Sequence, residues 1–256
     1  MALPPPTTSG CIWITGASSG IGAAVALELS RRGYRIAASA RGEEGLRDLA
    51  SRAGPGPVSC FPLDVTDHDA VLATARAIEQ ADGPILGALL CAGTYKPIAA
   101  QGFDAREAEK QIAVNFAGVV HALEPLLETM LERGQGHIAI VASLTSRFGL
   151  PRAGVYGATK AALVNLAQAL RAECRGQGVT VQVINPGFVK TPLTDKNDFP
   201  MPFLVPAERA ARIVADGMAG NSFEIAFPWQ ISWATALLAR LPRRLAFALT
   251  SRMVDR

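Results

Sequence analysis

The chain has 256 residues, of which 49% are hydrophobic and 18% are charged, and its formal net charge is +3. This length fits one large α/β domain with a substantial core. The small net charge, together with the lack of a Lys/Arg-rich run or an aromatic RNA-binding signature, argues against a nucleic-acid-binding protein.

The chain alternates short apolar runs with helical patterns after a proline-rich start. Residues 1–10 hold three consecutive prolines and no apolar core, so we expect a disordered tail rather than a signal peptide or a helix. Strands are predicted near residues 11–15, 35–40, 58–63, 85–91, 137–142, 179–185 and 223–227. Helices are predicted near residues 20–32, 43–53, 67–80, 104–132, 154–175 and 206–219.

This alternation is typical of right-handed β-α-β crossovers. It predicts an α/β, single-domain Rossmann fold over residues 11–228, with a doubly wound parallel sheet of about seven strands and helices on both faces. Ligands of such sheets bind outside the carboxyl ends of the strands. Gly16, Arg41, Asp64, Gly93 and Ser143 all fall at those predicted ends.

A glycine-rich turn joins the first strand to the first helix, and it reads Thr15-Gly16-Ala17-Ser18-Ser19-Gly20-Ile21-Gly22. Gly16 allows a tight turn, Gly20 removes a side chain where the backbone approaches a pyrophosphate, and Gly22 lets the helix pack closely on the sheet. The helix N-terminus offers N–H groups to the phosphates. Alone, the motif could merely close a strand-helix unit, but at the first strand of an alternating chain it indicates a dinucleotide site.

Tyr156 and Lys160 are separated by one helical turn, and Tyr156 follows Ser143 by 13 residues. A phenol has a pKa of about 10 and is a poor base. An ammonium at i+4 lies on the same helix face, and its charge is predicted to pull the pKa of Tyr156 toward the working pH. The spacing alone occurs by chance in any helix, so its meaning depends on the glycine-rich turn.

With these motifs in this order, the chain resembles the short-chain dehydrogenase/reductase family over about residues 10–228. The resemblance rests on the glycine-rich turn, Asp64-Val65, Ala92-Gly93, Asn115, Ser143, Tyr156-x-x-x-Lys160 and Asn185-Pro186-Gly187. One position departs from the family, which has Asn-Ala-Gly after the fourth strand, because Cys91 replaces that asparagine. The way in which this strand end is braced is therefore open.

The resemblance implies hydride transfer between a nicotinamide and a ketone or secondary alcohol. Tyr156 would exchange a proton with the carbonyl oxygen, and Ser143, rather than the nearby Ser146, would polarise the same oxygen. Lys160 would lower the pKa of Tyr156 and hydrogen-bond the nicotinamide ribose. Asn115 would interrupt a long helix and anchor a water that links Lys160 to solvent.

The end of the second strand distinguishes NADP from NAD. Family members that use NAD carry aspartate at the position of Ala40, and here Arg41 follows immediately. Arg41 is predicted to clamp a 2′-phosphate and Ser39 to add a hydrogen bond, so we predict NADP; the alternative is a solvated arginine.

The resemblance also implies further cofactor contacts along the chain. Asp64 and Val65 would contact adenine, although Asp64 could instead cap the following helix. The backbone of Val189 and the hydroxyl of Thr191 would fix the carboxamide and pyrophosphate. The remaining residues assigned to the cofactor are Ser18, Ser19, Ile21, Ala92, Gly93, Lys160, Pro186 and Gly187.

The four cysteines and three histidines show no ligand or C-x-x-C spacing. We therefore expect no metal and no disulfide, and a cytoplasmic protein. The resemblance implies a homodimer or homotetramer. Residues 188–205 occupy the family's substrate-lid position, and their apolar side chains (Phe199, Met201, Phe203, Leu204 and Val205) favour an apolar ketone or alcohol, unless they only pack the lid onto the body.

Residues 229–256 are predicted to form a basic amphipathic helical extension. Apolar side chains recur at every fourth position, and they are Trp233, Leu237, Leu241, Leu245 and Leu249. Five arginines accompany the single acid Asp255, and Pro242 is predicted to kink or divide the helix. Residues 229–253 are expected to contact an anionic membrane surface, to pack on a neighbouring subunit or to shield the active site.

The leading prediction is an NADP(H)-dependent oxidoreductase. The alternatives are an NAD-dependent dehydrogenase, an isomerase or epimerase on the same scaffold, and a non-catalytic cofactor-binding protein. The intact set of Asn115, Ser143, Tyr156 and Lys160 argues against the last, because nothing structural requires all four.

Overall fold

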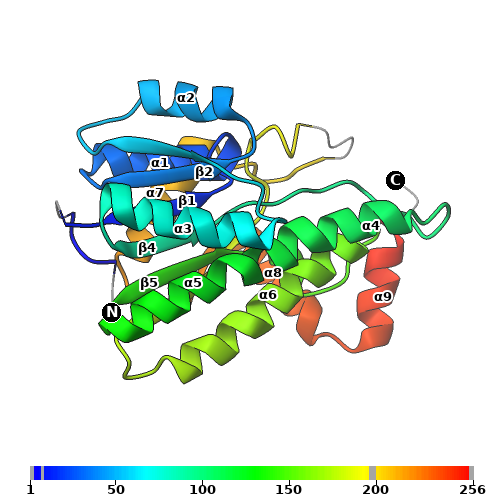
Figure 1. The fold of residues 1–256 in the computed structure, drawn as a ribbon. Helices are drawn as coiled ribbons and strands as arrows, with labels where there is room; N and C mark the ends of the chain where they lie inside the picture. The colour runs from blue at the N-terminus through cyan, green and yellow to red at the C-terminus, as the bar shows by residue number, and fades with distance from the viewer. Residues whose placement is uncertain (1–2, 7–8, 196–199, 254–256) are drawn as a thin grey trace.

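The fold is a seven-stranded parallel sheet between two layers of helices. The computed structural model describes residues 3–6, 9–195 and 200–253. The strands occur in the order β3-β2-β1-β4-β5-β6-β7, and every neighbouring pair is parallel. They are β1 (Cys11–Thr15), β2 (Ile36–Ala40), β3 (Val58–Pro62), β4 (Ile85–Leu90), β5 (Gly136–Val141), β6 (Val179–Pro186) and β7 (Glu224–Phe227). The predicted Rossmann fold is confirmed (Figure 1).

The helices alternate with the strands up to β7. They are α1 (Gly20–Arg31), α2 (Glu43–Ser51), α3 (His68–Asp82), α4 (Ala105–Ile112), α5 (Gly118–Arg133), α6 (Gly154–Glu173), α7 (Ala207–Met218), α8 (Trp229–Arg240) and α9 (Arg243–Ser251). A five-residue π-helix, η1 (Ala113–Ala117), joins α4 to α5, and a 3₁₀ turn, η2 (Leu144–Ser146), follows β5.

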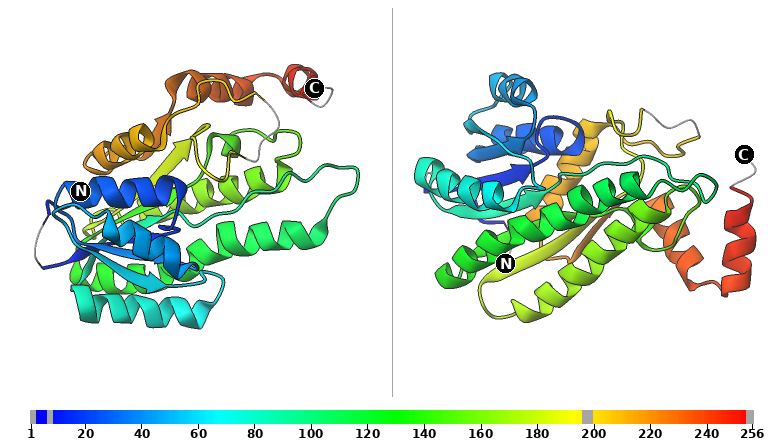
Figure 2. Two further views of the ribbon diagram at one scale, coloured as in Figure 1. Left: turned by 90° about the horizontal axis from the view of Figure 1, so that it is seen from above. Right: turned by 45° about the vertical axis from the view of Figure 1, so that its right-hand side comes forward.

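The two helical layers bury two separate apolar clusters on the sheet. Helices α1, α2 and α7 pack on one face, with Val25, Leu46 and Val214 among the buried residues. Helices α3, α5 and α6 cover the other face, where Ile78 and Leu163 are buried. Figure 2 shows the sheet between these layers in its left view. Burial on both faces explains why strands such as β4 read as continuous apolar runs.

The strand order reverses between β1 and β4. From β1 the chain continues to β2 on one side, and from β4 it continues to β5 on the other, so the connections that follow these two neighbouring strands diverge. In open α/β sheets this switch point is where ligands bind. The fold therefore positions a site at the ends of β1, β4 and β5.

Two segments refine the sequence-based expectations. Within the stretch expected to be a disordered tail, Leu3 is buried against the first cluster and its N–H donates to the Met218 carbonyl at 2.9 Å. The helix expected over 104–132 is broken at Asn115 by the π-helix η1. Such π-bulges inside α-helices occur frequently at functional sites.

The C-terminal extension divides at Pro242, as its sequence predicts, because Pro242 is the N-cap of α9. In both views of Figure 2, α9 (red) lies at the margin of the molecule. Among the described residues, none of the helices combines the length and the apolar character needed to cross a bilayer.

Candidate active site

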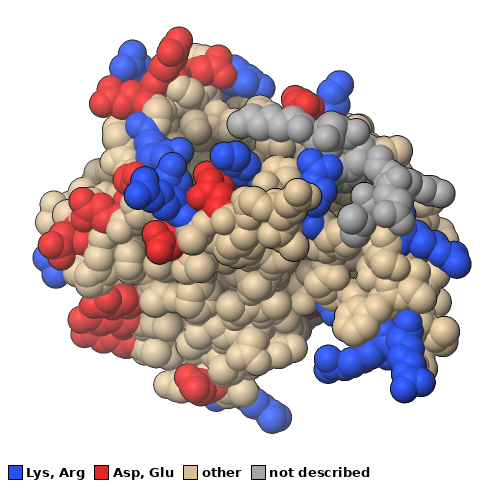
Figure 3. Space-filling view, turned by 90° about the vertical axis from the view of Figure 1, so that its right-hand side faces the viewer, with Lys and Arg blue, Asp and Glu red and all other residues tan. Residues whose placement is uncertain are grey.

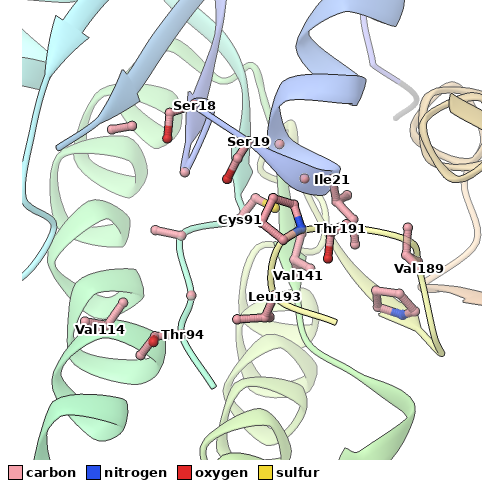
Figure 4. A pocket seen from close by; sticks show the side chains of 18 of the residues that line it. Ser18, Ser19, Ile21, Cys91, Thr94, Val114, Val141, Val189, Thr191 and Leu193 are labelled. Carbon is pink, nitrogen blue, oxygen red and sulfur yellow. The ribbon is translucent and has the colours of Figure 1, made fainter. Parts of the chain in front are cut away.

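A cleft of about 400 Å³ opens at the carboxyl ends of the strands. Its walls come from the glycine-rich turn, from the ends of β2 to β6 and from the start of the lid. Figure 4 shows Ser18, Ser19 and Ile21 on one side and Cys91, Val141 and Thr191 at the centre. Val114, on η1, and Thr94, in the loop after β4, lie on the other side. The cleft therefore joins the predicted cofactor and catalytic residues, except Ser39 and Asn115, in one cavity.

The glycine-rich turn has the geometry that its glycines predict. Gly16 and Gly20 have φ of +69° and +58°, a region that favours glycine. A Cβ on Gly22 would lie 2.3 Å from the Gly16 carbonyl oxygen, so only glycine allows α1 to start this close to the turn. The N-cap of α1 is Ser19, whose side chain makes no capping bond. The first N–H groups of α1 thus face the cleft without a side-chain cap.

Ser39 and Arg41, which were both predicted to contact a 2′-phosphate, have different surroundings at the end of β2. Arg41 is exposed and lines the cleft together with Ala40. Ser39, in contrast, is buried, and its Oγ accepts a hydrogen bond from Trp13 Nε1 at 2.9 Å. The structure does not bring Ser39 into the cleft, because successive strand residues point to opposite faces and Ser39 points into the sheet packing.

Asp64 and Val65 line the cleft after β3. Asp64 Oδ1 accepts from the N–H and the hydroxyl of Thr66 at 3.0 and 2.8 Å. These bonds, and more weakly the charge of Arg41, lower the pKa of Asp64. Asp64 is not the helix cap, because the N-cap of α3 is Asp67, which accepts from Ala70 N–H.

Ser143, Tyr156 and Lys160 converge at the end of β5. The Ser143 hydroxyl is hydrogen-bonded to Tyr156, and Ser143 rather than Ser146 lines the cleft. Lys160 is 4% exposed, and its Nζ donates to the Val141 carbonyl at 2.8 Å and lies 5.7 Å from the centroid of the Tyr156 ring. One hydroxyl, one phenol and one buried amine thus share a single wall of the cleft.

Burial controls the protonation of this group. Burial raises the pKa of Tyr156 to about 12, against the lowering effect of the Ser143 hydrogen bond. Burial also lowers the pKa of Lys160 to about 8. The predicted lowering of the Tyr156 pKa by Lys160 is not seen in the chain alone, where the loss of hydration is the largest influence on that pKa. Tyr156 therefore holds its proton at neutral pH.

Asn115 lies behind the cleft rather than in its lining. It is fully buried, its Nδ2 donates to the Thr94 carbonyl at 2.9 Å, and its Oδ1 accepts from the Thr94 N–H at 2.7 Å. This two-way bond fixes the loop that follows Gly93. A Cβ on Gly93 would meet both Asn115 Oδ1 and Lys160 Nζ at 3.4 and 3.7 Å.

The structure shows what braces the strand end at Cys91. Thr15 Oγ1 accepts from the N–H groups of Cys91 and Ala92 at 3.1 and 3.3 Å. The backbone of Gly22 hydrogen-bonds the Cys91 thiol, and burial raises the pKa of that thiol to about 11. The ends of β1 and β4 are thereby tied to the glycine-rich turn without the usual asparagine.

The turn after β6 forms the opposite wall. Pro186, Gly187, Val189 and Thr191 all line the cleft. The Thr194 hydroxyl fixes their backbone, because it donates to the Val189 carbonyl at 2.6 Å and accepts from the Thr191 N–H at 3.0 Å. These residues come from a loop whose arrangement depends on side-chain hydrogen bonds rather than on regular secondary structure.

Several residues of the site were not predicted from the sequence. Tyr95 packs edge-on against Tyr156, with ring centroids 5.0 Å apart. The bracing role of Thr15 could have been suspected, because this residue ends β1. In contrast, no sequence pattern pairs Tyr95 with Tyr156. Further lining residues are Ala40, Gly42, Leu63, Cys91, Thr94, Val114, Val141, Ala142, Pro192, Leu193 and Thr194.

The lid and the C-terminal helices adjoin this site. In the lid, Val205 is buried in the core, whereas Phe203 and Leu204 are exposed; Phe199 lies outside the described residues. Arg147 follows η2 and donates to the backbone and hydroxyl of Ser232 on α8 at 2.6 and 3.0 Å. The segment after Ser143 is thus attached to the C-terminal extension.

Most of this chain is similar in sequence to known proteins. The family model described as "short chain dehydrogenase" matches residues 10–200. An "uncharacterized oxidoreductase" of Myxococcus xanthus is 37% identical over 242 residues, which make up 94% of this chain and 96% of the relative.

Solved structures agree with this likeness. An actinorhodin polyketide ketoreductase with NADPH is 28% identical, has a TM-score of 0.77 and matches 87% of this chain and 96% of its own. A short chain dehydrogenase/reductase from Burkholderia phymatum in complex with NAD is 25% identical, has a TM-score of 0.83 and matches 90% of this chain and 93% of its own.

Proposed function

Since this chain belongs to the short-chain dehydrogenase family and is an oxidoreductase, we propose that it reduces an apolar ketone to a secondary alcohol with NADPH, or runs the reverse reaction. The observation that carries this proposal is the convergence of Ser143, Tyr156 and Lys160 on a cleft that opens with a glycine-rich turn. Ketone and alcohol are the substrates for which a protonated phenol and a hydroxyl donor are chemically suited.

The residues present fit a dinucleotide. A Cβ on Gly16 or Gly22 would meet backbone atoms at 2.8 or 2.3 Å, and one on Gly20 would crowd the Thr191 side chain at 3.3 Å. The three glycines thus let the turn pack closely at the start of α1, where the N–H groups would meet a pyrophosphate. Ser18 and Ser19 would add hydroxyl groups there, and Asp64 and Val65, which line the same cleft, would hold the adenine. Pro186, Gly187, Val189 and Thr191 would hold the nicotinamide end, with Ile21, Ala92, Gly93 and Lys160 between the two ends.

NADP is favoured over NAD by the charge at the end of β2. Ala40 offers no carboxylate to repel a 2′-phosphate, and Arg41 lines the cleft with an exposed guanidinium. Among the described residues, the acid that lines the cleft is Asp64, whose carboxylate is engaged by Thr66 through two hydrogen bonds. Arg41 is therefore the group we assign to the 2′-phosphate.

The chain's own residues move the proton of the reaction. A bound nicotinamide would supply or accept the hydride. Tyr156 is protonated at neutral pH, so its Oη can donate a proton to a ketone oxygen that becomes an alcohol. Ser143 would donate a second hydrogen bond to the same oxygen as negative charge develops on it. Lys160 holds its ammonium beside the phenol and can return a proton to it, because the pKa of Lys160 is lowered to about 8.

An apolar substrate is supported by the surroundings of Tyr156. The Tyr95 ring packs against it, and Val114 and Leu193 line the same cleft. Phe203 and Leu204 of the lid keep exposed apolar side chains. A site with few polar partners selects substrates by apolar contact.

NADPH consumption with a panel of ketones graded by apolar size tests this function. We expect bulky apolar ketones to be reduced and small polar ones to be poor substrates. Tyr156→Phe should lower kcat by about 100-fold or more while NADPH affinity is kept, since only the proton donor is lost. Tyr34→Phe, outside the cleft, is the matched control and should keep full activity. Unchanged activity of Tyr156→Phe would show that the proton comes from elsewhere.

A further inference from the structure

Helices α8 and α9 present apolar side chains to solvent. On α8, Trp229, Trp233 and Leu237 are 68%, 73% and 61% exposed, and their i, i+4, i+8 spacing places them on one face. No residue of α8 is buried. On α9 and just after it, the exposed apolar side chains are Leu245, Phe247, Leu249 and Met253. Exposed apolar surface of this extent indicates a docking surface.

All charged side chains of the same segment are basic. Residues 229–253 contain no aspartate or glutamate and four arginines, namely Arg240, Arg243, Arg244 and Arg252. All four are exposed, and within the described part of the chain none of them forms an ion pair with a carboxylate. Figure 3 views the side of the molecule on which α9 lies and shows basic side chains gathered at its lower right, bordered by uncharged surface.

This segment is attached to the body rather than loosely appended. The Arg147 guanidinium bridges the Ser232 carbonyl on α8 to the Glu224 carboxylate, at 2.6 and 2.5 Å. Ala246 and Thr250 are the buried side of α9, and the Phe247 ring lies 6.1 Å from that of Phe148. The α8–α9 segment therefore packs on the rest of the domain with one side, and its tryptophans and arginines face solvent.

We propose that the α8–α9 segment docks on the surface of an anionic lipid bilayer. Tryptophan side chains favour the interfacial region of a bilayer, and arginines are drawn to anionic headgroups. The helices would lie on the bilayer, because neither is long and apolar enough to cross it.

A second copy of the chain fits this surface less well. A two-fold interface sets the same patch against itself, which would bring Arg240, Arg243 and Arg244 toward their own copies with no acid in residues 229–253 to pair with them. An anionic bilayer supplies the opposite charge, so we commit to it as the partner. The proposal does not depend on the reaction.

Vesicle flotation of the full chain tests this docking. Vesicles of phosphatidylcholine containing about one third phosphatidylserine are compared with vesicles of pure phosphatidylcholine. Tryptophan emission provides a second readout, because Trp13 is fully buried and only Trp229 and Trp233 can change their surroundings. We expect binding to the anionic vesicles only, with a blue-shifted emission, and release when salt is raised.

Two variants separate the charge from the apolar contribution. Each basic residue near an anionic surface changes partitioning about fivefold, so R243Q/R244Q should weaken binding about 25-fold. W233S/L237S should weaken it by about tenfold or more and reduce the blue shift. R209Q/R212Q removes two exposed arginines from α7 and is the matched control, which should bind like the unchanged chain.

Equal binding to both kinds of vesicle, or full binding by R243Q/R244Q, would overturn the proposal. So would a lower sedimentation coefficient of W233S/L237S in the absence of lipid, since that result would show a second copy covering the surface. Loss of vesicle binding with an unchanged sedimentation coefficient and unchanged far-ultraviolet circular dichroism supports it.

Discussion

The ammonium group of Lys160 is buried, and this burial should lower the stability of the folded chain. Replacing Lys160 should reveal the lost free energy. Its side chain is 4% exposed, and burial lowers its pKa from 10.5 to about 8. The unfolded chain therefore binds a proton at this amine more tightly than the folded chain does. Lys160→Met removes the titrating group while it keeps an unbranched side chain of similar length.

The magnitude follows from the two pKa values. Below about pH 8 both states are protonated, and the folded state carries the full cost of about 3 kcal/mol. Between pH 8 and 10.5 the folded chain loses this proton before the unfolded chain does, so its stability rises with pH. From about pH 7 to pH 10, the wild-type chain should gain about 2.5 kcal/mol relative to Lys160→Met.

Urea unfolding of both chains across this pH range measures the difference directly. At neutral pH the variant also loses the bond from Nζ to the Val141 carbonyl, which is worth about 1.5–3 kcal/mol, so the two stabilities should be similar there. Titrating groups that do not interact with Lys160 cancel when the two chains are subtracted, and Cys91, whose pKa is raised by burial and lowered by Lys160, is replaced by serine in both chains. Lys190→Met, at an exposed lysine, is the matched control and should show no such rise.

A difference between wild type and Lys160→Met that stays flat with pH would refute the reasoning. It would mean that the Lys160 amine is hydrated in the folded chain, and that burial is not what sets the proton balance between Lys160 and Tyr156.

Two further substitutions test the architecture of the cleft. Gly22→Ala places a Cβ 2.3 Å from the Gly16 carbonyl oxygen, so it should lower the free energy of unfolding in urea by about 1–3 kcal/mol and weaken NADPH binding. Gly149→Ala is the control, because a Cβ there meets nothing within 4 Å, and it should change neither quantity. Asn115→Ala leaves the N–H and the carbonyl of Thr94 unpaired, at about 1–3 kcal/mol each, so the melting temperature should fall by several degrees, and an unchanged value would contradict the bracing role.

The fold could be predicted from the sequence because its signals are local. Burial on both faces makes strands such as β4 continuous apolar runs, and Gly22 is dictated by a backbone contact within its own turn. The carboxyl ends of parallel strands meet at one edge, so residues far apart in the sequence had to share a cleft.

What could not be predicted depends on three-dimensional surroundings. The sequence shows a lysine at i+4 from Tyr156, but it does not show that both are buried, and burial decides both pKa values. It also does not show which way Ser39 points, because that depends on the partner Trp13 on the neighbouring strand. The helical stripe of the C-terminal extension was visible, but its exposure was not.

Calorimetric titration of the purified chain with NADPH and with NADH tests the central claim most directly. We expect NADPH to bind tighter by about tenfold or more, which is about 1.4 kcal/mol. Arg41→Asp should abolish this difference, because it exchanges the phosphate-binding charge for a repelling one. Equal affinities, or a preference for NADPH that survives Arg41→Asp, would contradict the role assigned to Arg41. Failure of either nucleotide to bind would contradict the cofactor site itself.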